Sequence, residues 1–179
     1  PIGSYVPSVI KRPTAARDTR VSRRARDLVE RGEHFLRQAM TGEALREAIA
    51  RFDAALRDSP GYAAAYIGLA RAWFNMASGW YSDASPAGDH AVDALRKALE
   101  LEPSNALGWA LLGAVQYQFE HDWSKAERSL RRAVALAPHA AFTHSAYGWQ
   151  LVARGELAAA ERELTTAREL DPQYLNSRM

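Results

Sequence analysis

Cysteine is absent from this sequence of 179 residues. Without a thiol the chain forms no disulfide, no thiolate zinc site and no cysteine nucleophile. Long apolar runs are also missing, because none approaches the roughly 20 residues that a membrane-spanning helix needs. The N-terminus has no apolar segment behind its charged residues that would act as a signal peptide. We therefore expect a cytoplasmic protein without a membrane segment.

Motifs for nucleotide and metal chemistry are missing as well. The sequence contains neither G-x-x-x-x-G-K-[ST] nor G-x-G-x-x-G, the loops that hold phosphates. No two histidines have metal-ligand spacing on one helix face, and the five are scattered over His34, His90, His121, His139 and His144. The neighbouring His121 and Asp122 form an exposed pair in a predicted loop, with a ligand or general base as the alternative interpretation. The sequence therefore predicts no catalytic residue, no metal site and no cofactor, in a protein that is not an enzyme.

Charge is nearly balanced overall but unevenly distributed. The chain has 23 basic and 21 acidic side chains, a net charge of +2. Residues 1–31 hold eight basic side chains against three acidic ones, or +5, so the remainder carries −3. We interpret residues 1–21 as a basic extended arm, a solvated linker from a preceding domain. The alternative is that the arm contacts nucleic acid or an acidic surface. The arginine- and alanine-rich composition is typical of a GC-rich bacterial genome.

An internal repeat organises the rest of the chain. Four sets of alanine, large apolar residue, alanine and proline recur with internal spacings of 4, 3 and 5. The prolines step by 43, 35 and 34 residues, and the last step is the period of one known helical repeat. The four sets are Ala48, Phe52, Ala55, Pro60; Ala91, Leu95, Ala98, Pro103; Ala126, Leu130, Ala133, Pro138; and Ala160, Leu164, Ala167, Pro172.

The segment before each set carries a second pattern, W-x2-L-G-x2-Y. Trp109, Leu112 and Gly113 match it, with Gln116 at the tyrosine position. His144, Tyr147 and Gly148 occupy the corresponding positions in the last unit, so packing explains His144. Residues 22–172 thus resemble the tetratricopeptide repeat (TPR) family. The resemblance implies an all-α, right-handed α-solenoid of four helix pairs, or eight helices. The units are expected at 22–61, 62–104, 105–139 and 140–172.

Physical reasoning agrees with this pattern. Residues three and four apart lie on one helix face, so each set forms one apolar stripe. Small residues such as Gly32 and Gly113 allow two helices to approach closely. Proline has no N–H and disfavours helix in the residue before it, so it ends the second helix of each pair. A single pair cannot bury its apolar face, and several must stack.

Two regions depart from the repeat. Residues 75–89 contain nine extra residues, in which Gly79, Pro86 and Gly88 predict a partial loop. Trp80 and Tyr81 lie there as a possible secondary contact; the alternative is a first helix extended by one or two turns on which both rings pack. Residues 173–179 are expected to begin a truncated further helix. An array that ends abruptly exposes apolar surface, which favours homo-oligomers formed through the C-terminal end.

The TPR resemblance also implies a site. In that family the first helices form a concave groove, and ligands meet the second, fifth, ninth, twelfth and thirteenth positions of each unit. Aromatic rings beside polar groups in such a groove suit an amphipathic helix or extended peptide. The lysine and asparagine clamp of chaperone-binding TPR domains is absent, so chaperone docking is not expected. The predicted partner-binding residues are Glu33, Arg37, Arg71, Phe74, Asn75, Tyr117, Gln118, Phe142, Ser145 and Trp149.

Two short segments indicate a larger context. Pro1 to Pro7 resembles the end of a winged-helix-like segment that precedes TPR repeats in bacterial transcriptional regulators. Residues 123–138 are similar to TPR arrays fused to such regulators and to class III cyclases. The leading hypothesis is a protein-interaction scaffold that regulates an attached output domain. The alternatives are a homo-oligomerisation element and nucleic-acid contact through the basic arm.

Overall fold

The computed structural model describes residues 21–38, 41–79 and 84–172. These residues form eight α-helices and no strand, as the repeat predicts. The helices are α1 (Arg23–Gln38), α2 (Gly42–Asp58), α3 (Ala63–Ser78), α4 (Ala84–Leu101), α5 (Ala106–Gln118), α6 (Trp123–Leu136), α7 (Ala141–Ala153) and α8 (Leu157–Leu170). The predicted arm and the residues after Pro172 lie outside the described ranges, as do Trp80 and Tyr81.

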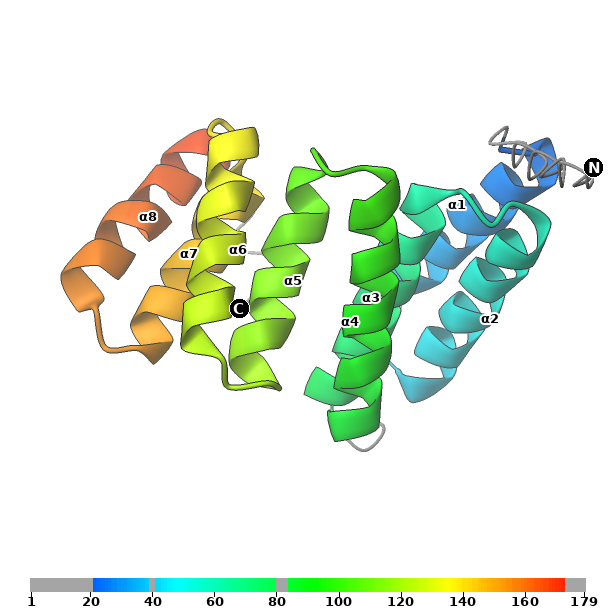
Figure 1. Cartoon of the computed structure of the whole chain (residues 1–179), viewed down its shortest axis with the longest axis horizontal. Helices are drawn as coiled ribbons and strands as arrows, with labels where there is room; N and C mark the ends of the chain where they lie inside the picture. Colours follow the sequence, from blue (N-terminus) through cyan, green and yellow to red (C-terminus); the bar gives the residue numbers. More distant parts are fainter. Residues whose placement is uncertain (1–20, 39–40, 80–83, 173–179) are drawn as a thin grey trace, which may run out of the picture.

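The helices pack as four consecutive antiparallel pairs, α1–α2, α3–α4, α5–α6 and α7–α8 (Figure 1). The second helix of each pair also contacts the first helix of the next pair. In every pair the expected proline follows the second helix closely. Pro60, Pro138 and Pro172 each come two residues after the last helical residue, and so does Pro103. The prediction that proline ends each second helix is therefore confirmed.

The array has an inner and an outer side. Successive first helices contact one another, α1 with α3, α3 with α5 and α5 with α7. Within the described residues, α2, α4, α6 and α8 make no such contact with each other. The first helices therefore converge and the second helices spread apart, which curves the array. The concave face is formed by α1, α3, α5 and α7.

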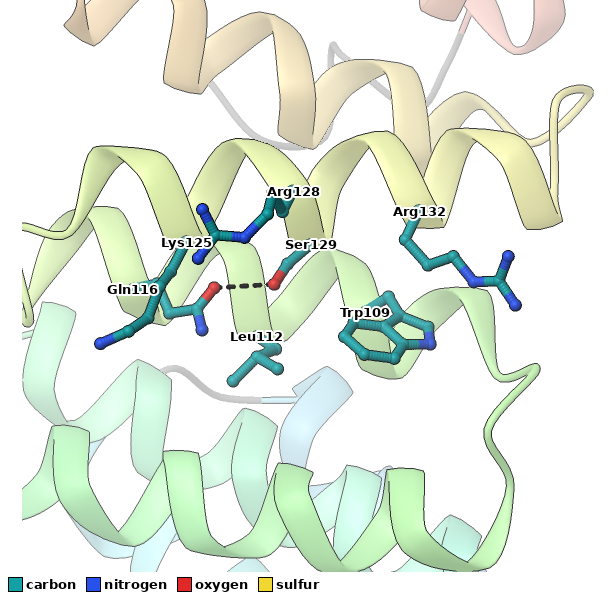
Figure 2. Close-up of a pocket in the computed structure, with 7 residues that line it drawn as sticks. All are labelled: Trp109, Leu112, Gln116, Lys125, Arg128, Ser129 and Arg132. Carbon is teal, nitrogen blue, oxygen red and sulfur yellow. Dashed lines mark hydrogen bonds between the residues drawn. The ribbon is translucent and has the colours of Figure 1, made fainter.

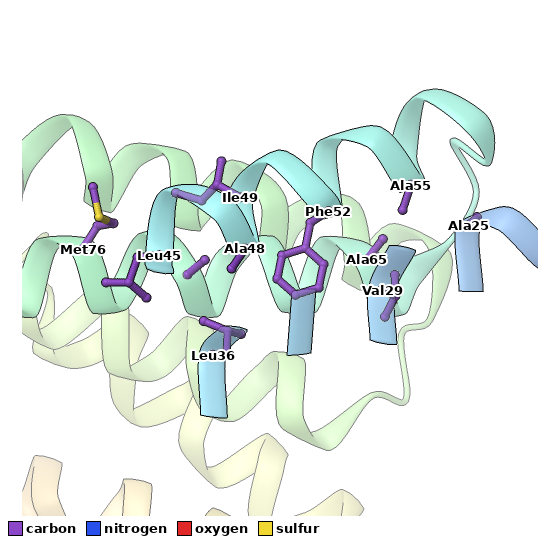
Figure 3. Close-up of a cluster of buried hydrophobic side chains, with 11 residues drawn as sticks. Ala25, Val29, Leu36, Leu45, Ala48, Ile49, Phe52, Ala55, Ala65 and Met76 are labelled. Atoms are coloured by element: carbon purple, nitrogen blue, oxygen red, sulfur yellow. The ribbon is translucent and has the colours of Figure 1, made fainter. Parts of the chain in front are cut away.

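The core of the first two pairs is built around Phe52 (Figure 3). This side chain is 0% exposed. A Cβ placed on Gly32 of α1 would lie 2.7 Å from the Phe52 ring, and one on Gly68 of α3 would also overlap it. The two glycines therefore leave the space that the ring fills between the pairs. The repeated alanines that flank the large apolar residue, such as Ala48 and Ala55, are buried in all four units.

The helices of the second unit are longer than those of the third and fourth units. Helix α3 has 16 residues where α5 and α7 have 13, and α4 has 18 where α6 and α8 have 14. The longer first helix was one of the predicted alternatives. The expectation that Pro86 and Gly88 break the helix is wrong. Pro86 lies in the first turn of α4, where its missing N–H costs nothing. Gly88 is buried against Phe119, whose Cβ would be 3.1 Å from an added Cβ.

Candidate partner-binding surface

The N-terminal half of the concave face is dominated by an ion pair between neighbouring units. Arg71 Nη1 on α3 donates to both carboxylate oxygens of Glu33 on α1, at 2.8 Å each. Arg37 lies one turn after Glu33, with 3.9 Å between the charged atoms. Arg71 was predicted to bind a partner, but its guanidinium is already bound by Glu33. Arg37, with 66% of its side chain exposed, is the more accessible cation here.

Phe74 packs inside the array. Its ring meets Phe119 edge to face, with centroids 5.8 Å apart and planes at 74°. Phe74 is half-buried against the cluster that joins the second and third units. The neighbouring Asn75 is half-buried, and its backbone carbonyl accepts a hydrogen bond from Gly79 at the end of α3. Packing between the second and third units thus accounts for Phe74.

The C-terminal half of the concave face presents apolar rings. Tyr117 at the end of α5 stacks on Trp123, with centroids 6.1 Å apart and planes at 20°. Trp149 on α7 is 44% exposed, and Val152, three residues later on the same helix face, is 36% exposed. Phe142 is half-buried at the start of α7. Helices α5 and α7 contact each other, and the assignment of these side chains to one groove stays a prediction.

Two predicted residues differ in accessibility, and one contributor was missed. Ser145 is 1% exposed, and its hydroxyl has no hydrogen-bond partner among the residues that the structure describes, so it is not accessible to a partner at the surface. Gln118 is exposed at the end of α5. Trp123, 38% exposed, was not predicted as a site residue. Trp123 is the first residue of α6, directly after the turn that follows α5. This position could have indicated from the sequence that Trp123 lies close to Tyr117.

Polar groups between the third and fourth units hold the units together. His144 Nε2 donates to the Pro138 carbonyl at 2.9 Å, and Nδ1 lies 2.7 Å from a carboxylate oxygen of Glu163. In the third unit the indole N–H of Trp109 donates to the Pro103 carbonyl at 2.9 Å. The histidine therefore replaces the tryptophan of the repeat in the same bond, and its packing role agrees with the sequence analysis.

The clearest electrostatic effect also lies between these units. Glu127 on α6 accepts hydrogen bonds from Arg154 at 2.6 Å and from Arg131 at 2.9 Å. The bond from Arg154, followed by that from Arg131, lowers the pKa of Glu127. Burial raises the pKa of Tyr147 nearby. These bonds link α6 of the third unit to the end of α7 in the fourth.

The described ranges contain neither a metal site nor a membrane-spanning helix. They contain no group of three His, Asp or Glu side chains arranged to hold a metal ion. None of their helices combines the length and apolar character required to cross a membrane.

No protein-family model and no curated protein sequence matches this chain. Solved structures do. TTC0263, a TPR protein from Thermus thermophilus, is similar with a TM-score of 0.66 at 20% identity, over 86% of this chain and 95% of that one. MamA gives a TM-score of 0.61 at 19% identity, over 85% and 81%. The first TPR of Spaghetti, in a structure with an HSP90 peptide, gives 0.58 at 18%, over 80% and 95%. These likenesses show a TPR-like helical solenoid.

Proposed function

We propose that this chain is a protein-interaction scaffold whose concave face binds a segment of a partner protein. The observation that carries the proposal is the exposed apolar region on the C-terminal half of that face. Trp149 and Val152 are 44% and 36% exposed, although the comparable large residues of the core are buried. Aromatic side chains that are rigid and partly exposed supply much of the binding energy at protein interfaces.

The geometry favours one manner of binding. An apolar side chain of the partner would rest on Trp149 and Val152 of α7, beside the Tyr117–Trp123 stack. A polar or acidic part of the same segment would extend toward Arg37 in the N-terminal half, whose side chain is 66% exposed. An amphipathic helix and an extended peptide both present such an arrangement.

A carboxylate clamp of the chaperone-binding kind is not part of this proposal. The side chains at the ninth position of successive units would form part of such a clamp. Here they are Glu33, Arg71, Ala114 and Trp149. The first two neutralise each other across α1 and α3. The partner's terminal carboxylate therefore has no prepared pair of donors at these positions, although the structure of Spaghetti with its HSP90 peptide has a similar fold.

Within a larger protein, the scaffold would serve as the regulatory module of a cytoplasmic bacterial transcriptional regulator. The basis is the resemblance of Pro1 to Pro7 and of residues 123–138 to segments of such regulators. Binding in the groove would then change the activity of the attached output domain. A reporter gene that responds to the partner only when the groove is intact is the expected result in the full-length regulator.

Affinity capture from a native extract tests the groove. Trp149→Ala removes the most exposed ring of the concave face, and Leu101→Ala, at a residue 43% exposed at the end of α4, is the matched control. Arg71→Glu is unsuitable because it would also break the pair with Glu33. We expect a partner that the unmodified chain and the control retain and that Trp149→Ala loses. Equal capture by all three chains would exclude the groove as the binding site.

Self-association is the second candidate function. The observation that favours it is the exposure of Leu157 and Leu170 on α8, at 66% and 38%. Sedimentation velocity over a hundredfold concentration range should then show a dimer that Leu157→Glu dissociates. A monomer at every concentration would remove this candidate.

A further inference from the structure

A second hollow lies on the third unit, away from the concave face. It has a volume of about 420 Å³ and is formed by α5 and α6. Figure 2 shows Lys125 and Arg128 of α6 at the Gln116 end and Arg132 at the Trp109 end, with Leu112 between them. The lining residues are Trp109, Leu112, Gln116, Lys125, Arg128, Ser129 and Arg132. We call this set the α5–α6 pocket.

The pocket and the groove use different faces of α5. Leu112 and Gln116 are four residues apart and share the pocket face. Ala110, Ala114 and Tyr117 follow the same spacing on another face, which belongs to the groove. The pocket opens on the outer side, where α4 and α6 do not contact each other within the described residues. A ligand can therefore occupy it without entering the groove.

The α6 side of the pocket is basic. Lys125 and Arg132 are seven residues apart, roughly 10 Å along a helix, and Arg128 and Arg132 are four residues apart, roughly 6 Å. The side chains of Arg128 and Arg132 extend toward opposite ends of the pocket (Figure 2). Lys125 pairs with Asp122 at 2.9 Å. Neither Arg128 nor Arg132 has a carboxylate within ion-pair distance among the residues that the structure describes. Two guanidinium groups are thus available to an acidic ligand at opposite ends of an apolar floor.

Gln116 adds a directed donor. This residue is only 8% exposed, and its Oε1 accepts a hydrogen bond from Ser129 at 2.8 Å. Its amide nitrogen has no acceptor in the described part of the chain. Unlike the amide of Gln150, it is not sealed from solvent, and Gln116 lines the pocket. Its N–H groups are therefore available to an acceptor that enters there.

We propose that the α5–α6 pocket binds an acidic segment of a partner protein. The segment carries two carboxylates roughly 10 Å apart, which on a helix are seven residues apart, with an apolar side chain between them. This spacing is wider than the helix rise between Arg128 and Arg132 because their side chains extend in opposite directions (Figure 2). The carboxylates meet Arg128 and Arg132, the apolar side chain lies on Leu112 and Trp109, and Gln116 donates to the nearer carboxylate. A pocket with walls from one helix pair leaves a small molecule largely exposed, so a peptide suits it better.

A designed peptide tests this directly. The probe is a fluorescein-labelled, alanine-based peptide of fifteen residues with glutamate at its fourth and eleventh positions and leucine at its seventh and eighth. Its twin has glutamine in place of both glutamates. Fluorescence anisotropy should show that the full chain binds the probe and not the twin. The double variant Arg128→Gln/Arg132→Gln should bind the probe at least tenfold more weakly.

The matched control is Arg162→Gln/Arg168→Gln on α8, which removes the same charge from exposed residues outside the pocket. The affinity of this control for the probe should stay within twofold of that of the unmodified chain. The same is expected of Trp149→Ala, so the test of the pocket does not depend on whether the groove binds a partner. Circular dichroism confirms equal helicity of all variants. Equal weakening by both double variants, or equal binding of probe and twin, would overturn the proposal. Displacement of the probe by equimolar inorganic phosphate would also overturn it, in favour of a small-anion site.

Discussion

The first and last units follow the same repeat but differ in what they bury. In the first unit, α2 buries Leu45, Ile49 and Phe52 among its core side chains. In the last, α8 buries only Ala160 and Ala167. Burial of a large apolar side chain contributes about 1.5–3 kcal/mol, far more than an alanine does. The repeat pattern therefore specifies the same helix pair at both ends while leaving its stability to the size of the side chains.

Helix capping and the burial of polar groups further increase the difference in stability between the first and last units. The hydroxyls of Ser22 and Thr41 accept backbone N–H bonds at the starts of α1 and α2. Neither α7 nor α8 has a side-chain cap. The side-chain amide of Gln150 on α7 is buried and has no hydrogen-bond partner within the described part of the chain. The last unit is thus expected to open more readily than the first, although it carries the exposed rings proposed to bind a partner.

The largest expected effect comes from truncation of the ring that joins the first two units. Phe52→Ala should lower the free energy of unfolding by about 3–5 kcal/mol, because it leaves a cavity in a fully buried site. Leu164→Ala, at the equivalent but partly exposed position of the last unit, should cost markedly less. Urea denaturation followed by circular dichroism measures both. Equal losses would mean that the two ends are equally well packed.

Adding a methyl group next to Phe52 should destabilise the fold more than adding one next to Leu164. Gly68→Ala places a methyl group into the Phe52 ring, which Gly32 confines from the other side, so a cost of about 1–3 kcal/mol is expected. At Gly148 the facing atoms belong to Leu164, a flexible side chain that can shift. The melting temperature of Gly68→Ala should therefore be lower than that of Gly148→Ala. Gly61→Ala is the control, because a Cβ added there has no neighbour within 4 Å. Equal melting temperatures for all three variants would contradict the prediction.

Replacement of one buried polar side chain by an apolar one should stabilise the last unit. Gln150→Leu replaces a buried amide without partners by an apolar group of similar volume, and about 1 kcal/mol of stabilisation is expected. Hydrogen exchange should slow in α7 and α8 and stay unchanged in α1 and α2. The exposed Gln118 provides the control Gln118→Leu, with no expected gain. Destabilisation by Gln150→Leu would show that the amide is satisfied in solution.

The smallest effect concerns pH. The bond from Arg154 lowers the pKa of Glu127 in the folded chain below its unfolded value. The stabilisation from Glu127 is therefore complete above the unfolded pKa and is lost as pH falls through the folded pKa. Hydrogen exchange of α7 should accelerate in acid more than that of α1, and Glu127→Gln should remove part of this difference. An unchanged profile in Glu127→Gln would contradict the role given to the pair.

The sequence predicted the fold well because repeated positions report the same environment four times. The buried alanines and the prolines after each second helix were both correctly placed. Single departures were harder, since Pro86 and Gly88 are helix breakers by type but lie in a first turn and against Phe119. The pairing of Arg71 with Glu33 depends on the contact between α1 and α3, which no spacing within one unit reveals. The groove residues of the C-terminal half remain predictions.

The convergence of the first helices has a mechanical consequence. Contacts between like helices run only along the inner side, so within the described ranges no outer helix packs against the next outer helix. The helix pairs can therefore rotate relative to one another about the contacts between the first helices. We expect the curvature of the array to change elastically in this way. A pull on its two ends should be taken up first as a change of curvature, at low force, before any helix pair separates. Optical-tweezer extension should show this soft regime ahead of the first unfolding step.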